Sequence, residues 1–330
     1  MAFRLAAEFA PQDWLWIGFP HDPAEWPNEL LSTAQAEIAG FANAVAESGQ
    51  DVRLIVRDDA NAAAARHLVS AKVTLEQQSY GDIWLRDTGP LTGFENGKRT
   101  ARRFGFNGWG GKFEMAGDQT IGANLARGSG LPFSEFPMIF EGGAIDHDGT
   151  GLAITTEQCL LNPNRNPSMD KDAIEQALKL SLGFDRMIWL GEGLIGDHTD
   201  GHVDNLARFV APAHCVIPAA IERDDPNAAI FADAKKRAEA DGLKVSAIPS
   251  AGMVMRDGAI EAASYANFVI TNHLVIVPQF GSPRDQDAVA ELDALFSGRT
   301  AIGLPASAVL AGGGSFHCAS QHCSGQHCSS

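Results

Sequence analysis

Apolar positions along the chain follow two spacings, one typical of helices and one typical of buried strands. Glu29–Ser48 shows the helical spacing most clearly and is followed by Gly49 as a C-terminal cap. Its apolar stripe consists of Leu30, Leu31, Ala34, Ile38, Phe41 and Val45. The pattern predicts further helices near Asn61–Val69, Asp118–Ala126, Asp170–Ser181, Ala228–Ala240 and Asp285–Phe296. Strands are expected at Trp14–Phe19, Val52–Val56, Val73–Glu76, Leu152–Thr155, Met187–Leu190, Leu206–Val210, Val216–Pro218, Val245–Pro249, Phe268–Thr271 and Leu274–Pro278.

This alternation predicts an α/β protein. No break in composition and no Ser/Pro-rich linker divides the 330 residues, so we expect a single domain. With 45% hydrophobic and 20% charged residues, the composition is that of a soluble globular protein with a sizeable core.

The net charge of -16 disfavours a nucleic-acid partner, which would require basic surface, and is compatible with a small cationic substrate. No apolar run approaches the roughly 18–20 residues that span a membrane. Met1–Leu5 lacks a cleavable secretory pattern, so we expect a cytoplasmic protein with no membrane partner. The sequence leaves a homodimer open and does not give the oligomeric state.

The five cysteines do not form a disulfide framework, because the count is odd and three of them crowd near the end. Cys159 and Cys215 have apolar neighbours and are interpreted as small buried hydrophobes. Cys318 differs because a flexible Gly312–Gly314 run precedes it and His317 adjoins it. A protonated His317 would favour the thiolate, which makes Cys318 the candidate nucleophile.

Gly196–Asp204 holds two histidines and three aspartates. In a helix, His198 and His202 would lie one turn apart and could share a metal ion. In an extended segment, His198, Asp200, His202 and Asp204 would share one face. We favour the extended interpretation, because Gly201 is a poor residue for a helix interior and the following residues have strand character.

Two other segments carry carboxylates that suit a flat cation. Trp84 and Asp87 precede a Thr-Gly-Pro turn, where an indole can stack on a guanidinium and a carboxylate can accept its paired hydrogen bonds. A surface ion pair before a turn is the plainer alternative.

Glu141 follows an apolar run and precedes two glycines that let other backbone approach closely. Its plainer alternative is a tight turn with an incidental acid.

A metal site is the competing interpretation. The His-Cys pairs of the C-terminal tail and the 197–204 segment could supply zinc ligands, but they lack CxxC pairs, finger spacing and an HExxH motif. We therefore predict no functional metal and no organic cofactor. The glycine-rich segment Phe106–Lys112 lacks the spacing of a phosphate-binding loop and is interpreted as a packing or lid segment.

Taken in order, several motifs resemble those of the agmatine deiminase family in the guanidino-group-modifying, or pentein, superfamily. The matching segments are Trp84–Pro90, Phe106–Lys112, Glu141–Gly143, Leu160–Pro167, Thr199–Asn205, Val277–Gly281, Gly312–Gly314 and His317–Cys318. The likeness runs from about Phe19 to about Gln321. It implies a five-bladed α/β propeller of pseudo-fivefold symmetry with the site in its central channel.

The resemblance also implies roles for single residues. Cys318 is then the nucleophile, His202 the general acid/base and Glu141 its carboxylate partner, while Asp87 and Asp204 hold the guanidinium. For agmatine, the products would be N-carbamoylputrescine and ammonia, and the enzyme would feed putrescine synthesis. The alternatives are a peptidyl-arginine deiminase and, from another class, a metal-dependent hydrolase, which excess EDTA would inactivate.

The chain departs from the family pattern at two places. His198 stands four residues before His202, where some members have an acid that helps to bind the distal amine, so His198 and Asp200 are only candidate substrate contacts. The catalytic domain is expected to cover residues 1–321. Residues 322–330 are expected to form a frayed Ser/His/Cys-rich tail, with metal scavenging or redox exchange with Cys318 as alternatives.

Overall fold

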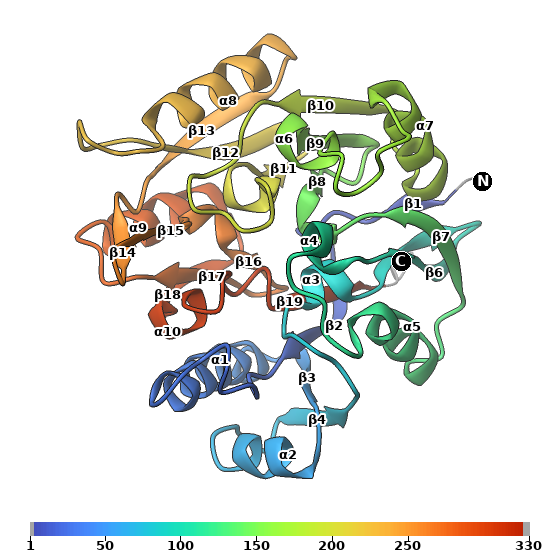
Figure 1. Ribbon diagram of the computed structural model, residues 1–330, viewed down its shortest axis with the longest axis vertical. Coiled ribbons are helices and arrows are strands. Elements are labelled where there is room, and N and C mark those ends of the chain that lie inside the picture. Colours follow the sequence, from blue (N-terminus) through green and yellow to red (C-terminus); the bar gives the residue numbers. More distant parts are fainter. Residues whose placement is uncertain (1–2, 326–330) are drawn as a thin grey trace.

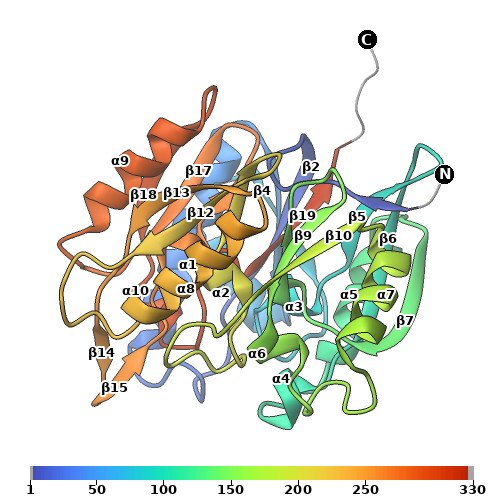
Figure 2. The same ribbon diagram turned by 90° about the horizontal axis from the view of Figure 1, so that it is seen from above.

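The computed structural model describes residues 3–325. Within that range the strands form five sheets of three or four strands and one two-stranded hairpin. Figures 1 and 2 show these sheets grouped about a common centre, with the longer helices on the outside. The prediction of a mixed α/β fold is confirmed.

The first sheet has the hydrogen-bonded order β19 (Ser320–Ser324), β2 (Gln12–Gly18), β3 (Asp51–Val56) and β4 (Val73–Gln77). The second has the order β1 (Arg4–Leu5), β5 (Leu91–Glu95), β6 (Lys98–Gly105) and β7 (Phe133–Ile139). The third is β10 (Arg186–Leu190), β9 (Leu152–Thr156) and β8 (Ile145–His147). The fourth is β11 (Arg208–Ala211), β12 (His214–Ala219) and β13 (Lys244–Pro249), and the fifth is β16 (Val269–Ile270), β17 (Leu274–Gln279) and β18 (Thr300–Pro305). The hairpin is β14 (Val254–Arg256) and β15 (Ala259–Glu261).

The longer helices are α1 (Leu30–Glu47), α2 (Asp59–Arg66), α5 (Asp118–Gly128), α7 (Lys171–Leu182), α8 (Ala228–Ala240) and α9 (Asp285–Leu295). The short ones are α3 (Leu85–Thr88), α4 (Gly108–Gly111), α6 (Glu157–Leu160), α10 (Ser307–Leu310), η1 (Gly142–Ala144), η2 (Val203–Asn205) and η3 (Tyr265–Asn267).

Each of the five sheets contains the same unit of three strands. The first two strands are antiparallel, and a helix then leads to the third strand, which pairs in parallel with the second. In the third sheet, for example, β8 and β9 are antiparallel, and α7 then leads to β10, which pairs with β9 in parallel register. The helices bury one apolar face against the sheets: in α1, Ile38 and Phe41 of the predicted stripe are fully buried, whereas Leu30 and Leu31 are only partly so.

The two ends of the described chain meet in one sheet. β19 pairs antiparallel with β2, with Cys323 opposite Trp14, and His322 and Cys323 are buried. The prediction of a frayed tail beginning at residue 322 is therefore wrong for residues 322–325, because this segment completes a sheet edge. Residues 326–330, and with them the His327-Cys328 pair, lie outside the described residues.

A short helical segment or turn immediately precedes the antiparallel pair of each unit. These segments are α3 before β5, η1 before β8, η2 before β11, η3 before β16, and the turn over residues 316–319 before β19. Consecutive segments contact one another, α3 with η1, η1 with η2, and η2 with η3. Figure 1 places α3, β8, β11 and β19 near the middle of the molecule. Side chains carried by these segments therefore converge.

In the part of the chain that the structure describes, no helix combines the length and apolar character needed to cross a bilayer.

Candidate active site

The predicted catalytic and guanidinium-holding residues all lie on these inner segments. Asp87 belongs to α3, Glu141 directly precedes η1, His202 and Asp204 lie at η2, and Cys318 lies in the turn before β19. Each is at most 7% exposed. The same position in four of the repeated units thus supplies the five side chains, although they are up to 231 residues apart in sequence (87 to 318).

The thiol of Cys318 lies between an amide and a carboxylate. Asn267, on η3, donates from Nδ2 to the sulfur over 3.1 Å, and Asp204 Oδ2 is 3.6 Å from it. Burial, together with the charges of Asp204 and Asp87, raises the pKa of Cys318 well above its ordinary value. These surroundings favour the neutral thiol, and a cation nearby would favour its ionisation.

His202 lies between two carboxylates. Its Nδ1 is 3.6 Å from Asp87 Oδ1, and its Nε2 is 3.9 Å from Glu141 Oε2. Burial opposes the charge on the ring, but Asp87, Cys159 and Glu141 outweigh it and raise the pKa of His202 well above its ordinary value. At neutral pH His202 is thus an imidazolium, which can donate a proton.

Arg165 fixes Glu141 by donating from Nε to Oε1 over 3.0 Å. Burial opposes ionisation of Glu141, but His202 and Arg165 lower its pKa, so it remains a carboxylate. Arg165 also contacts Asp200, whose carboxylate receives a further bond of 2.6 Å from Lys112.

These contacts correct the extended interpretation of Gly196–Asp204. The segment consists of turns followed by η2, and Asp200 takes the left-handed conformation with φ 65°. Asp200 consequently faces Arg165 and Lys112, while Asp204 faces Cys318. The strand itself begins only at Arg208. Alternating side-chain directions do not apply across a turn, so the even spacing was misleading.

Asp87 and Asp204 are each oriented by two neighbours. Asp87 accepts hydrogen bonds from Trp109 Nε1 and from the backbone N–H of Gly143, both over 3.0 Å. Burial and the charge of Asp204 raise the pKa of Asp87 to about 6. Asp204 Oδ2 lies 2.8 Å from His317 Nδ1 and 3.4 Å from Asn267 Nδ2.

A buried network supports Asp204 from behind. His317 bridges Asp204 and Glu8, with 2.9 Å between its Nε2 and Glu8 Oε2. Glu8 also contacts Arg86 at 3.2 Å and Arg208 at 3.0 Å. The ring nitrogens of His317 thus bind carboxylates, which corrects the expectation that His317 acts on the Cys318 thiol directly. Glu8 had no sequence signal, because a single acid in the stretch before the first long strand resembles any surface residue.

A pocket open to the surface leads to Cys318. Its lining residues are Glu25, Asp82, Trp84, Asp87, Trp109, Phe113, His198, Thr199, Ala311, Gly312, Gly313, Gly314 and Cys318. Among these there is no lysine or arginine, and three are carboxylic acids. Of the residues predicted to contact the substrate, Trp84, Asp87 and His198 line this pocket, whereas Asp200 and Asp204 do not. Glu25, Asp82 and Trp109 were missed; Trp109 lay within the segment interpreted as packing or lid.

Glycines are required here for close approach rather than for flexibility. A Cβ at Gly143 would lie 2.6 Å from His202 Nδ1 and 2.8 Å from Asp87 Oδ1. A Cβ at Gly312 would lie 2.3 Å from the ring of Trp26. The prediction that other backbone approaches the glycines after Glu141 closely is confirmed at Gly142, where a Cβ would lie 2.1 Å from the carbonyl oxygen of Arg86. Gly312 and Gly314 pack against the indole rings of Trp26 and Trp84.

The sequence profile described as Porphyromonas-type peptidyl-arginine deiminase matches residues 4–323. The chain belongs to this deiminase family. A protein of Vibrio parahaemolyticus, provisionally named an agmatine deiminase, is 33% identical to this deiminase over 97% of the chain and 96% of its own length.

Solved structures of agmatine deiminases are also similar to this chain. The agmatine deiminase of Enterococcus faecalis, described as catalysing its reaction, has a TM-score of 0.92 and 28% identity, covering 98% of this chain and 96% of its own. A cysteine-to-serine variant of the C. jejuni agmatine deiminase with substrate bound has a TM-score of 0.91 and 28% identity, covering 98% and 97%. These likenesses identify the pentein fold and confirm the predicted class of enzyme, a hydrolase of guanidino C–N bonds.

Proposed function

We propose that this deiminase hydrolyses agmatine to N-carbamoylputrescine and ammonia and so feeds putrescine synthesis. The observation that carries the proposal is the lining of the pocket, which joins Trp84, Asp87 and Cys318 without any lysine or arginine. Arginine would bring an α-carboxylate into this acidic space with no cation to receive it, whereas agmatine carries a cation at both ends.

The position of the carboxylates fits a dication. Asp87 lies 3.6 Å from His202 and Asp204 lies 3.6 Å from Cys318, and carboxylates in these positions can hold a guanidinium plane by paired hydrogen bonds. Glu25 and Asp82 line the pocket with His198 and are available to a distal ammonium. Burial raises the pKa of both Glu25 and Asp82, so a bound ammonium would favour their ionised forms.

The first half of the reaction follows from these positions. A guanidinium between Asp87 and Asp204 offsets their charge beside Cys318, and the thiol releases its proton to solvent. The thiolate attacks the central carbon, and the imidazolium of His202 gives a proton to one nitrogen, which leaves as ammonia. A thiouronium adduct on Cys318 remains, and His202 is now neutral.

The second half uses His202 as a base. It removes a proton from water, and the oxygen attacks the adduct carbon. The C–S bond breaks, the ureido product forms, and the sulfur takes up the proton of the intermediate to return to the thiol. Glu141, held by Arg165, stabilises the imidazolium in both halves. Every step uses groups of this chain.

We also propose that the five repeated units are the blades of a five-bladed propeller. The repetition of an antiparallel pair and a parallel strand in each sheet supports this arrangement, as does the convergence of the segments that precede β5, β8, β11, β16 and β19. In such an arrangement the site residues would lie at the inner ends of the blades.

The test is to measure ammonia release from agmatine, arginine and a blocked arginine peptide, with Cys318→Ala as the inactive control. We expect efficient turnover of agmatine only, with kcat/KM for arginine lower by about 100-fold or more, because one desolvated unpaired carboxylate costs several kcal/mol. Comparable turnover of the peptide would identify a peptidyl-arginine deiminase instead. Full activity in Cys318→Ala would exclude the covalent mechanism.

A further inference from the structure

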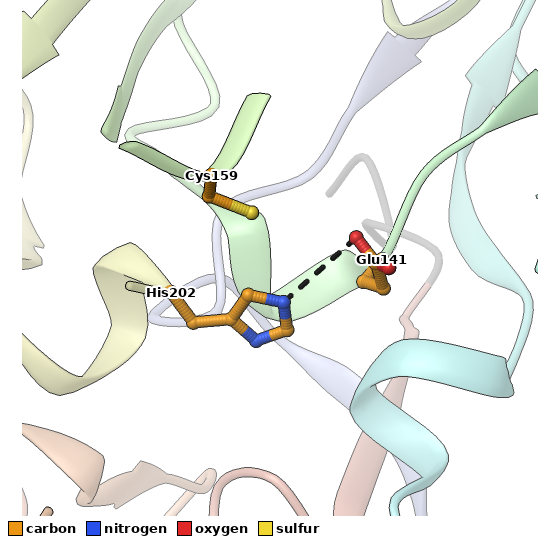
Figure 3. A group of neighbouring side chains, drawn as sticks. All are labelled: Glu141, Cys159 and His202. Carbon is orange, nitrogen blue, oxygen red and sulfur yellow. Dashed lines mark ion pairs between the residues drawn. The ribbon is translucent and has the colours of Figure 1, made fainter. Parts of the chain in front are cut away.

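We propose that Glu141, Cys159 and His202 form a binding site for a thiophilic divalent cation, Zn²⁺ above all, and that the cation inhibits the enzyme. The three side chains come from different segments, the residue before η1, helix α6 and the residue before η2. Figure 3 shows them pointing toward one another. One ligand atom from each lies within 4.8 Å of the others, and all three residues are buried.

Two of these ligand atoms face each other without a hydrogen bond. In the described part of the chain, neither Glu141 Oε2 nor His202 Nε2 makes a hydrogen bond, and they lie 3.9 Å apart. Buried polar atoms without a hydrogen bond cost free energy, and 3.9 Å is too long for one, so this position favours a group that binds both atoms. Cys159 neither attacks the substrate nor transfers a proton in the proposed reaction, although it helps to raise the pKa of His202, and its sulfur lies beside the two atoms.

The donor set selects the kind of cation. One sulfur, one imidazole nitrogen and one carboxylate oxygen are zinc ligands, and three protein ligands leave the fourth position of a tetrahedral site for water. Mg²⁺ and Ca²⁺ prefer oxygen alone. With metal–ligand distances of about 2.0–2.3 Å, the side chains would have to close in by roughly 1 Å.

Neighbouring groups already orient two of the ligands. Arg165 holds the other oxygen of Glu141 over 3.0 Å, and the Thr156 side chain caps α6 by accepting from the backbone N–H of Cys159. Such supporting bonds fix metal ligands in position. Asp87 lines the pocket and lies 3.6 Å from Nδ1 of His202, so one residue of the pocket lining contacts a ligand of the site.

Occupation of the site would stop the proposed reaction. The cation would form bonds to the sulfur of Cys159, to a nitrogen of His202 and to an oxygen of Glu141. The thiol and the imidazolium would each lose a proton to solvent. His202 could then no longer donate a proton to the leaving ammonia. The inhibitory effect therefore rests on the proposed function, whereas binding of the cation does not.

Binding is tested first, without any substrate. The full-length chain carrying Cys318→Ala and Cys328→Ser removes the nucleophile and the tail cysteine as competing thiols. Titration with Co²⁺ should give one thiolate-to-metal absorption band per chain, and calorimetry should give one Zn²⁺ per chain. Adding Cys159→Ser should abolish the band and weaken Zn²⁺ binding at least about 10-fold. Glu141→Gln, tested in parallel with a thermal melt of each variant, should also weaken binding.

Inhibition is tested second, with agmatine and otherwise unaltered protein. Zn²⁺ should inhibit, EDTA should restore the rate, and Mg²⁺ should have no effect. For Cys159→Ser, inhibition is measured relative to the rate of this variant without Zn²⁺. Its inhibition constant for Zn²⁺ should be at least about 10-fold higher than that of the unaltered enzyme. Equal Zn²⁺ binding with and without Cys159, or no binding at all, would overturn the site. Binding through Cys159 in an enzyme inactive on agmatine would retain the site and reject the proposed function.

Discussion

The charge of each buried carboxyl group in the site is set by its nearest partner. Glu141 and Asp204 are both fully buried, yet His202 and Arg165 lower the pKa of the first and His317 lowers that of the second. Asp87 has a backbone N–H and an indole as its hydrogen-bond donors, and its pKa is raised to about 6 by burial and by Asp204. Of the two proposed guanidinium holders, Asp87 and Asp204, only Asp87 should therefore titrate close to neutral pH.

This difference predicts an acid limb in the pH profile. Below pH 6 Asp87 is protonated and can no longer accept both hydrogen bonds of a guanidinium, so kcat/KM for agmatine should fall about tenfold per pH unit. Above that value Asp87 is charged and the limb ends. The measurement is kcat/KM from initial rates on both sides of pH 6. A profile that stays flat through this range would contradict the role of Asp87.

Glu8 is the positioning residue that the network behind Asp204 depends on. Glu8→Gln removes the charge that faces Arg86, Arg208 and His317, so we expect a lower thermal unfolding midpoint, from a loss of about 3–5 kcal/mol. Because Glu8 does not line the pocket, kcat should fall more than KM rises. Glu47→Gln, at an exposed ion pair with Lys72, is the matched control. Equal behaviour of the two variants would remove Glu8 from the account.

At the scale of elements, periodic segments were predictable and turns were not. Helix Ala228–Ala240 was predicted with its correct ends, and α1, α5, α7 and α9 to within two residues. Strands β5 and β6 were missed because charged residues interrupt the apolar run, as in Lys98–Gly105. The signal lay in the turn between them, Asn96-Gly97, where both residues have positive φ. Asp257-Gly258 likewise connects β14 and β15.

The site residues lie on the elements that sequence reasoning resolves least. Residue types and the family resemblance predicted Cys318, His202, Glu141, Asp87 and Asp204, and the structure brings them together. Their mutual geometry was out of reach, because it depends on how short segments from four units meet. Partners such as Asn267 and Arg165 could not be predicted, since nothing local marks an amide or a guanidinium that acts across such distances in sequence.

Strand β19 allows an element-scale prediction. Cys323 is fully buried opposite Trp14, so Cys323→Lys places a further cation at a buried position near Arg99 and Arg53. We expect a loss of about 3 kcal/mol or more, seen as a lower unfolding midpoint, while Cys323→Ala should lose much less. Identical melting of the two variants would show that the segment does not pack as described and would restore the frayed tail.

The molecule as a whole is acidic, and the acidity continues into the pocket. A net charge of -16 and three lining carboxylic acids should attract a dication over distances that salt screens. We expect kcat/KM for agmatine to fall several-fold between about 0.02 M and about 0.5 M salt, with kcat nearly constant. Salt independence of kcat/KM would mean that the overall charge does not assist substrate capture.

The account as a whole depends on a covalent bond between Cys318 and the guanidine carbon. Intact-protein mass spectrometry of enzyme quenched during agmatine turnover, followed by peptide mapping, tests it most directly. We predict a mass increase equal to agmatine minus ammonia, located on Cys318 and absent from Cys318→Ala. Turnover with no adduct on any residue, or an adduct on another cysteine, would contradict the mechanism.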